Sequence, residues 1–165
     1  MKILNEISNL MKGTEEYVYS LQNPENYTFL FTKNGLTKDG QKLKLGPSCY
    51  GLKLFYMLGI WDKIDTKNQN DWIKYINSFQ KNIKGFPENS YIDEIFLDSY
   101  KKNKAINSIK DITKTTLNFS PSFQYDTNKI KLQKAINAET KQAIATLQDI
   151  GAKNEKSLDR KSTRL

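Results

Sequence analysis

The most continuous apolar run in the chain lies between two short breaks, at residues 46–61. Its apolar positions fall on all sides of a helix rather than in one stripe, which is typical of a buried helix. Pro47 suits a first helical position, because its missing N–H costs nothing there, and Gly59 favours a tight exit. A weaker copy of this run spans residues 139–151. We therefore expect two buried helices, with the rest of the chain packed around them.

Residues 70–80 show the contrasting pattern of one apolar stripe and one polar side. The stripe consists of Trp72, Ile73, Ile76 and Phe79. This spacing predicts an amphipathic helix that buries one side and exposes the other. A fully buried helix followed by a half-buried one predicts an αα-hairpin with an inner and an outer member.

The remaining segments complete an all-α prediction. Helical spacing predicts further helices at 3–11, at 14–21 after a stop at Lys12-Gly13, at 91–104, and at 129–150, the last either continuous or broken near Asn137. Residues 106–117 are ambiguous, because threonines weaken a helical pattern. Residues 118–128 are predicted as loop. Residues 27–31 are aromatic and β-branched, so we expect a short extended or hairpin segment near 27–45. This segment either lines a mouth or, as we favour, caps the end of the first helices.

Composition narrows the class of protein. The length of 165 residues suffices for one domain. The chain has no apolar run of about 18 residues, the length that would predict a membrane span. The N-terminus lacks the pattern of a secretory signal, and a single Cys49 cannot form an internal disulfide. The net charge of +8 comes almost entirely from scattered lysines, which favours a solvated surface over a nucleic-acid partner. We expect a cytoplasmic protein.

The end of the chain differs from the rest. Both arginines, Arg160 and Arg164, lie in residues 159–165, a run that resembles the translation of a sequencing adapter. We expect these residues to be a non-native tail that plays no part in the fold. On this interpretation residues 1–158 form a single incomplete domain, and the natural chain continues beyond them.

The inner–outer pattern resembles a known superfamily. Residues 72–80, which run into Gly85-Phe86-Pro87, resemble the repeat of the terpenoid cyclase and protein prenyltransferase α/α-toroid superfamily. In that repeat a helix ends in Ile-x-x-x-Gln, here Ile76 to Gln80, and a glycine-containing turn follows. The runs at 45–59 and 139–151 are similar to inner helices of bacterial toroid proteins, and the resemblance covers roughly residues 1–152. It implies a partial α/α toroid of helical hairpins, with exposed apolar flanks because two inner helices cannot close a ring.

The catalytic motifs of the superfamily are mostly missing. Its prenyltransferases hold zinc with a set that includes histidine, and this chain has no histidine. The Asp-x-Asp-Asp motif of its cyclases is absent as well, so we predict no metal site and no evident cofactor. The nearest acidic group consists of Asp93, Glu94 and Asp98, with the last two on one helical face. Such carboxylates bind Mg²⁺ and a diphosphate in other proteins, but we favour a solvated acidic face.

Four other residues are better candidates for a site. The toroid resemblance places Lys53, Tyr56, Glu139 and Gln142 on inner helices, where they would point into a central cavity. Charges in such a place are costly and often have a role. A purely structural Lys53–Glu139 ion pair is the alternative.

Three functions remain open at this point, and the sequence does not decide whether the protein is an enzyme. The resemblance implies a fragment of a bacterial toroid protein with a central cavity for an apolar or prenyl-like ligand such as an isoprenoid. The first alternative is a non-enzymatic helical repeat scaffold that binds a protein partner. The second is a carbohydrate-active α/α-toroid enzyme, for which a polar groove lined by Tyr, Asn and Arg would be the sign.

Overall fold

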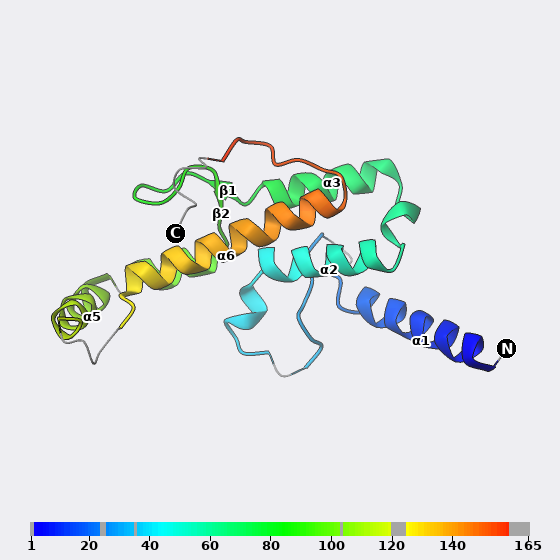
Figure 1. The fold of residues 1–165 in the computed structure, drawn as a ribbon, viewed down its shortest axis with the longest axis horizontal. Coiled ribbons are helices and arrows are strands. Elements are labelled where there is room, and N and C mark those ends of the chain that lie inside the picture. Colours follow the sequence, from blue (N-terminus) through cyan, green and yellow to red (C-terminus); the bar gives the residue numbers. More distant parts are fainter. Residues whose placement is uncertain (1, 24–25, 35, 103, 120–124, 159–165) are drawn as a thin grey trace. The chain divides into compact units, whose positions relative to one another are not determined.

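The computed structural model describes residues 2–23, 26–34, 36–102, 104–119 and 125–158, and these ranges are mostly helical (Figure 1). The helices are α1 (Lys2–Tyr19), α2 (Leu45–Met57), α3 (Thr66–Asn77), α4 (Glu94–Lys102), α5 (Lys104–Leu117) and α6 (Asn128–Asp149). Two 3-10 turns, η1 (Gly40–Lys42) and η2 (Trp61–Lys63), and the strands β1 (Gln80–Lys81) and β2 (Ser90–Tyr91) accompany them. The mostly helical prediction is confirmed. The tail at 159–165 and part of the loop expected at 118–128 lie outside the described residues.

The chain divides into two compact units. Unit 1 consists of Met1–Phe79 and Gln142–Glu155, and unit 2 consists of Gln80–Lys141 and Lys156–Leu165. The prediction of one incomplete domain over residues 1–158 stays a prediction. No helix that the structure describes is both long enough and apolar enough to cross a membrane.

The core of unit 1 is built around Trp72 of α3, which is 1% exposed. The Phe29 ring stacks on it with the ring centroids 5.5 Å apart, and Phe55 of α2 meets it edge-on at 5.2 Å. Aromatic side chains bury large areas and prefer such offset or edge-on contacts. The amphipathic helix predicted at 70–80 is present as α3, with Trp72 and Ile76 buried and Lys74 exposed, but it ends at Asn77, and this residue of the predicted polar side is buried.

Helix α2 is buried on one side only, which corrects the prediction for residues 46–61. The buried side chains are Leu45, Pro47, Ser48, Cys49, Leu52 and Phe55. Tyr56 and Met57 are exposed by 46% and 77%, so a helix that is apolar all round has here an apolar face in solvent. Pro47 is the third residue of α2, still within the first turn where backbone N–H groups have no intrahelical acceptor. Gly59 has φ +66, which confirms the tight exit.

Helix α1 is continuous, whereas a stop was predicted at Lys12-Gly13. The glycine lies inside the helix, and a single glycine costs only about 1 kcal/mol there. The Thr14 hydroxyl donates to the Leu10 carbonyl at 2.8 Å, so this threonine continues the helix and does not begin one. The apolar stripe of α1 is exposed over Ile3, Leu4, Ile7, Leu10 and Met11.

The segment after α1 turns back on itself. The Asn23 N–H donates to the Thr28 carbonyl, and the Leu30 N–H donates to the Leu21 carbonyl, both at 2.9 Å. Residues 28–30 therefore pair with residues 21–23, which precede them in the chain. Between this pairing and the start of α2 at Leu45, η1 is the only regular element that the structure describes. The expected extended segment exists, but its partner is upstream.

Unit 2 combines a short hairpin with packed helices. Strands β1 and β2 are antiparallel, with Gln80 opposite Tyr91. The buried cluster consists of Ile92, Leu97, Leu132 and Ile136. The helix predicted at 91–104 begins later, at Glu94, because Tyr91 belongs to β2. Helix α5 resolves the ambiguous segment, since its threonines donate to carbonyls one turn earlier in the helix. Helix α6 is continuous through Asn137.

Two buried amides hold the segment that follows α6. In unit 1, Asn77 donates to the Lys153 carbonyl and accepts from the Glu155 N–H, each at 3.2 Å. In unit 2, Gln80 accepts from the Lys156 N–H at 2.9 Å and donates to its carbonyl at 3.0 Å. Gln80 is the last residue of the Ile-x-x-x-Gln pattern, and its amide satisfies both polar groups of one backbone residue.

A pair of glycine substitutions tests the packing of unit 1. A methyl group at Gly51 would overlap the ring of Phe29, whereas one at Gly13 would meet nothing within 4 Å. Gly51→Ala should lower the free energy of unfolding by about 1–3 kcal/mol through overpacking. The matched control Gly13→Ala should raise it by about 0.5–1 kcal/mol, because alanine favours a helix interior. Urea unfolding measures both, and equal effects would contradict the packing described.

Candidate ligand-binding pocket

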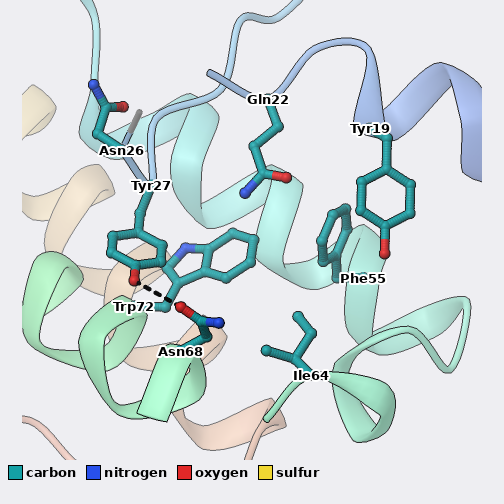
Figure 2. A pocket seen from close by; sticks show the side chains of 8 residues that line it. All are labelled: Tyr19, Gln22, Asn26, Tyr27, Phe55, Ile64, Asn68 and Trp72. Atoms are coloured by element: carbon teal, nitrogen blue, oxygen red, sulfur yellow. Dashed lines mark hydrogen bonds between the residues drawn. The ribbon is translucent and has the colours of Figure 1, made fainter. Parts of the chain in front are cut away.

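A pocket with a volume of about 300 Å³ lies in unit 1 (Figure 2). Its lining comes from the end of α1, the loop after it, α2, the segment that leads into α3, and α3 itself. The lining residues are Tyr19, Gln22, Asn26, Tyr27, Phe55, Ile64, Asn68 and Trp72. Four aromatic rings and three carboxamides thus share one small cavity, at the lower end of the size range of ligand sites.

The aromatic residues form the walls and the floor. Figure 2 shows Tyr27 and Tyr19 on opposite sides of the pocket, with Trp72 and Phe55 between them. The Tyr19 and Phe55 ring centroids are 4.9 Å apart, and those of Tyr27 and Trp72 are 5.7 Å apart. Because Trp72 is almost fully buried while Tyr19 is 46% exposed, the rings lead from the core out to solvent.

The loop that carries Gln22 and Tyr27 is held by its own hydrogen bonds. The Asn26 side chain accepts from the Thr28 backbone N–H at 2.9 Å, which is the arrangement of an Asx turn. Together with the backbone pairing of residues 21–23 and 28–30, this turn places Gln22 and Tyr27 at the mouth. In Figure 2 the Gln22 amide and the Ile64 side chain both point into the space between the two tyrosines.

A chain of polar contacts orients the amide of Asn68. Asp65 caps the N-terminus of α3 by accepting the Asn68 backbone N–H at 3.0 Å, and this bond holds the pKa of the Asp65 carboxyl below its ordinary value. The same carboxylate accepts from Asn68 Nδ2, which leaves Asn68 Oδ1 to accept from the Tyr27 hydroxyl at 3.3 Å. The cap therefore decides which end of the amide faces the pocket.

The pocket offers neutral polar groups. Burial raises the pKa of Tyr27, and the charges of Asp71 and Asp65 raise it further. Burial and then the charge of Glu15 raise the pKa of Tyr19. Both phenols therefore keep their proton at and above neutral pH. None of the eight lining residues is acidic or basic. Trp72 Nε1 is buried and makes no hydrogen bond within the described part of the chain.

Three of the residues that the sequence singled out lie elsewhere in unit 1. Lys53 Nζ lies 3.1 Å from Asp149 Oδ2, so its partner is Asp149 and the expected pairing with Glu139 is wrong. Gln142 donates to the Gly46 carbonyl at 3.2 Å. Tyr56 is exposed on α2. None of the three lines the pocket.

The fourth residue, Glu139, is buried in unit 2. It is 9% exposed and accepts the Asp93 backbone N–H at 2.9 Å. Burial raises the pKa of Glu139 to about 7, with the charge of Asp93 adding to this and the hydrogen bond opposing it. Next to Glu139, the Thr140 hydroxyl accepts the Tyr91 N–H at 3.0 Å.

The acidic group for which a solvated face was favoured over a Mg²⁺ site is divided between different surroundings, and the solvated face is wrong for Asp93. Asp93 is 2% exposed, Glu94 pairs with Lys81 at 2.5 Å, and Asp98 is exposed. No group of three or more His, Cys, Asp or Glu side chains within the described ranges could hold a metal ion, and these three acids do not form one.

Sequence reasoning missed most of the pocket. Trp72 was assigned to a helix stripe and Tyr27 to an aromatic segment for which a mouth was one of two interpretations. Gln22 and Asn68 gave no signal, because isolated amides in a polar chain are common.

Comparison with known family models, curated proteins and solved structures gives no match. The function of this chain is therefore inferred from its own geometry.

The Lys53–Asp149 pair provides a test of the residue that the sequence favoured. Its side chains are 34% and 43% exposed, and such partly exposed pairs contribute little. Lys53→Met and Asp149→Asn should each change the free energy of unfolding by less than about 1 kcal/mol, and a double-mutant cycle should give a coupling of about 0.2–1 kcal/mol. A large loss from Lys53→Met without a matching coupling to Asp149 would indicate that Lys53 has a further partner.

Glu139 should make stability depend on pH. Its raised pKa means that the folded protein keeps the proton while the unfolded chain releases it between about 4.5 and about 7. The free energy of unfolding should therefore fall as pH rises through this window. Glu139→Gln keeps a carbonyl acceptor for the Asp93 N–H and should be about 1–3 kcal/mol more stable than the wild type at pH 8.

Urea unfolding between pH 5 and pH 8 measures this effect. The control Asp98→Asn removes an exposed carboxylate from α4 and should keep the wild-type slope. If Glu139→Gln also keeps the wild-type slope across that range, burial does not hold the proton on Glu139.

Proposed function

We propose that unit 1 binds a neutral carbohydrate, with one sugar ring held in the aromatic pocket. The observation that carries this proposal is the combination of two facing tyrosines with an uncharged set of amides at their edges. Of the three functions left open by the sequence, a polar groove lined by Tyr and Asn was the sign of the carbohydrate one. The pocket has the Tyr and Asn of that sign, with Gln22 added and without Arg.

The chemistry of the pocket matches both the faces and the edge of a sugar ring. A pyranose has C–H groups on its faces, which pack against aromatic rings such as Tyr19 and Tyr27. Its hydroxyls lie around the edge, and each both donates and accepts. A carboxamide such as that of Gln22 offers a donor and an acceptor in one group, so it suits hydroxyls better than a single charge would. Asn68 presents its Oδ1 end, which also accepts from the Tyr27 hydroxyl.

We propose that the pocket binds the carbohydrate, and we do not propose that it catalyses a reaction. General acid–base or nucleophilic catalysis needs a group that titrates near the working pH. The lining residues offer amides, an aliphatic side chain and aromatic rings, and burial keeps both phenols protonated. A carbohydrate-binding module is therefore the form of the proposal that the pocket supports.

An apolar or prenyl-like ligand is the second candidate. The aromatic rings and Ile64 would suit an isoprenoid chain. A prenyl diphosphate, however, needs cationic partners for its charge, and the lining has none. The relation to the α/α-toroid superfamily remains a proposal as well, and its support is the succession of the two helices α2 and α3, although α2 is buried on one side only.

Tryptophan fluorescence tests the two candidates against each other. The chain has two tryptophans, so Trp61→Phe leaves Trp72 at the pocket floor as the one reporter. Oligomers of glucose and of N-acetylglucosamine should each be titrated, and at least one series should give a saturable change. Farnesol should give none. A saturable response to farnesol alone would overturn the carbohydrate proposal in favour of the apolar ligand, and no response to any probe would overturn both.

Substitutions in the pocket test the residues involved. Tyr27→Phe and Asn68→Ala each remove one polar group and should weaken sugar binding by roughly 3–10-fold, the size of one hydrogen bond. Asn70→Ala, an exposed position on the same helix, is the matched control and should leave the affinity unchanged. Thermal unfolding of each variant separates loss of binding from loss of folding. Equal affinities for all three variants would exclude this pocket as the sugar site.

A further inference from the structure

Helix α5 exposes its apolar side. Ile106, Ile109 and Ile112 are 54%, 66% and 68% exposed. Amphipathic helices in globular units normally turn such a stripe towards the core. The side of α5 that is partly covered carries Asn107 and Asp111 instead. The helix is therefore inverted with respect to the usual arrangement.

Hydrogen bonds from the polar side hold this orientation. The Asn128 N–H, at the start of α6, donates to Asp111 Oδ1 at 2.6 Å. The Asn128 side chain donates to the Asn107 carbonyl at 3.4 Å, and Asn107 Nδ2 donates to the Tyr100 carbonyl of α4 at 3.3 Å. Rotating α5 to bury its isoleucines would break these bonds. The outward stripe is thus a consequence of specific polar contacts within unit 2.

Basic side chains border the stripe, and further apolar ones extend it. Leu117 and Phe119, at the end of α5, are 44% and 85% exposed. Lys110 is exposed and Lys114 half-exposed along one edge of the stripe. The acid between them in sequence, Asp111, lies on the partly covered side of the helix, where it accepts the Asn128 N–H. The border therefore favours an anionic partner, as does the net charge of +8 for the whole chain.

We propose that α5 docks on an anionic lipid surface, lying in the plane of the interface. Isoleucines at the centre of the stripe would sink below the headgroups, while Lys110 and Lys114 would stay level with the phosphates. This separation of apolar centre and basic border is typical of helices that lie on membranes. An acidic protein groove is the rival occupant. The lipid is favoured because the apolar surface continues past the helix to Phe119, and such an aromatic inserts readily at a membrane interface.

Vesicle co-sedimentation with the full chain tests this proposal. The probes are vesicles of phosphatidylcholine alone and of an equimolar mixture of phosphatidylcholine and phosphatidylglycerol. The protein should sediment with the mixed vesicles, and added salt should reduce the bound fraction, because it screens the lysines. Binding to both vesicles alike, or to neither, would overturn the proposal. Sugar binding does not depend on α5, so the two proposals fail separately.

Matched substitutions locate the surface. Ile109→Glu and Ile112→Glu together put charge in the stripe and should reduce binding at least about tenfold. Thr115→Glu adds a charge at an exposed position outside the stripe on the same helix and should reduce binding far less. Lys110→Gln should weaken binding and its dependence on salt. Equal losses in the stripe and control variants would show that charge alone decides binding and would overturn the role of the stripe.

Sedimentation velocity tests another possible occupant of the stripe, a second copy of the chain. The protein should remain at one molecular mass over a wide range of concentrations in the absence of lipid. Self-association that Ile109→Glu abolishes would show that a second copy of the chain covers the stripe, and would overturn the lipid proposal.

Discussion

Burial of one indole ring organises unit 1. Trp72 lies within contact distance of Phe29, Phe55, Trp61 and Tyr27, which come from separate stretches of the chain. Each ring removes apolar area from water and also restrains its neighbours, because edge-on and stacked contacts depend on angle as well as distance. The shape of the pocket is therefore set by the core itself. A ligand there would contact rings that are held in position before it arrives, which lowers the cost of binding.

Hydrogen bonds between polar groups position the remaining side chains of the pocket. Asp65 performs a local task, capping α3, and through the side chain of Asn68 the same carboxylate influences Tyr27. Buried or partly buried polar groups are expensive unless each finds a partner, and here the partners form a short series that ends at the pocket. In unit 2, the buried Glu139 has the Asp93 N–H as its hydrogen-bond partner, and burial still raises its pKa to about 7.

The helical spacing of apolar residues correctly predicted those helices that turn a single apolar stripe towards a core. Residues 70–80 and 129–150 are of this kind, and both are helices. It failed at Gly13, where the helix tolerates a weak residue, and at α2, where an apolar surface is exposed. The Asp149 partner of Lys53 was not foreseen, and Glu139, the partner considered as an alternative, is wrong, because a pairing across the fold depends on packing that no local pattern encodes. The pocket was missed for the same reason, since its polar residues come from a loop and a helix terminus.

Unit 1 consists of two stretches of sequence that are separated by most of unit 2. During synthesis, Met1–Phe79 leaves the ribosome long before Gln142–Glu155 exists, so Leu147 and Ala143 cannot contribute their buried surface until late. Closing such a long loop is a slow, entropically costly step. The nascent chain therefore carries an unfinished apolar core for the time needed to make more than sixty residues. That interval, more than the stability of the finished fold, is when aggregation or chaperone binding competes with folding.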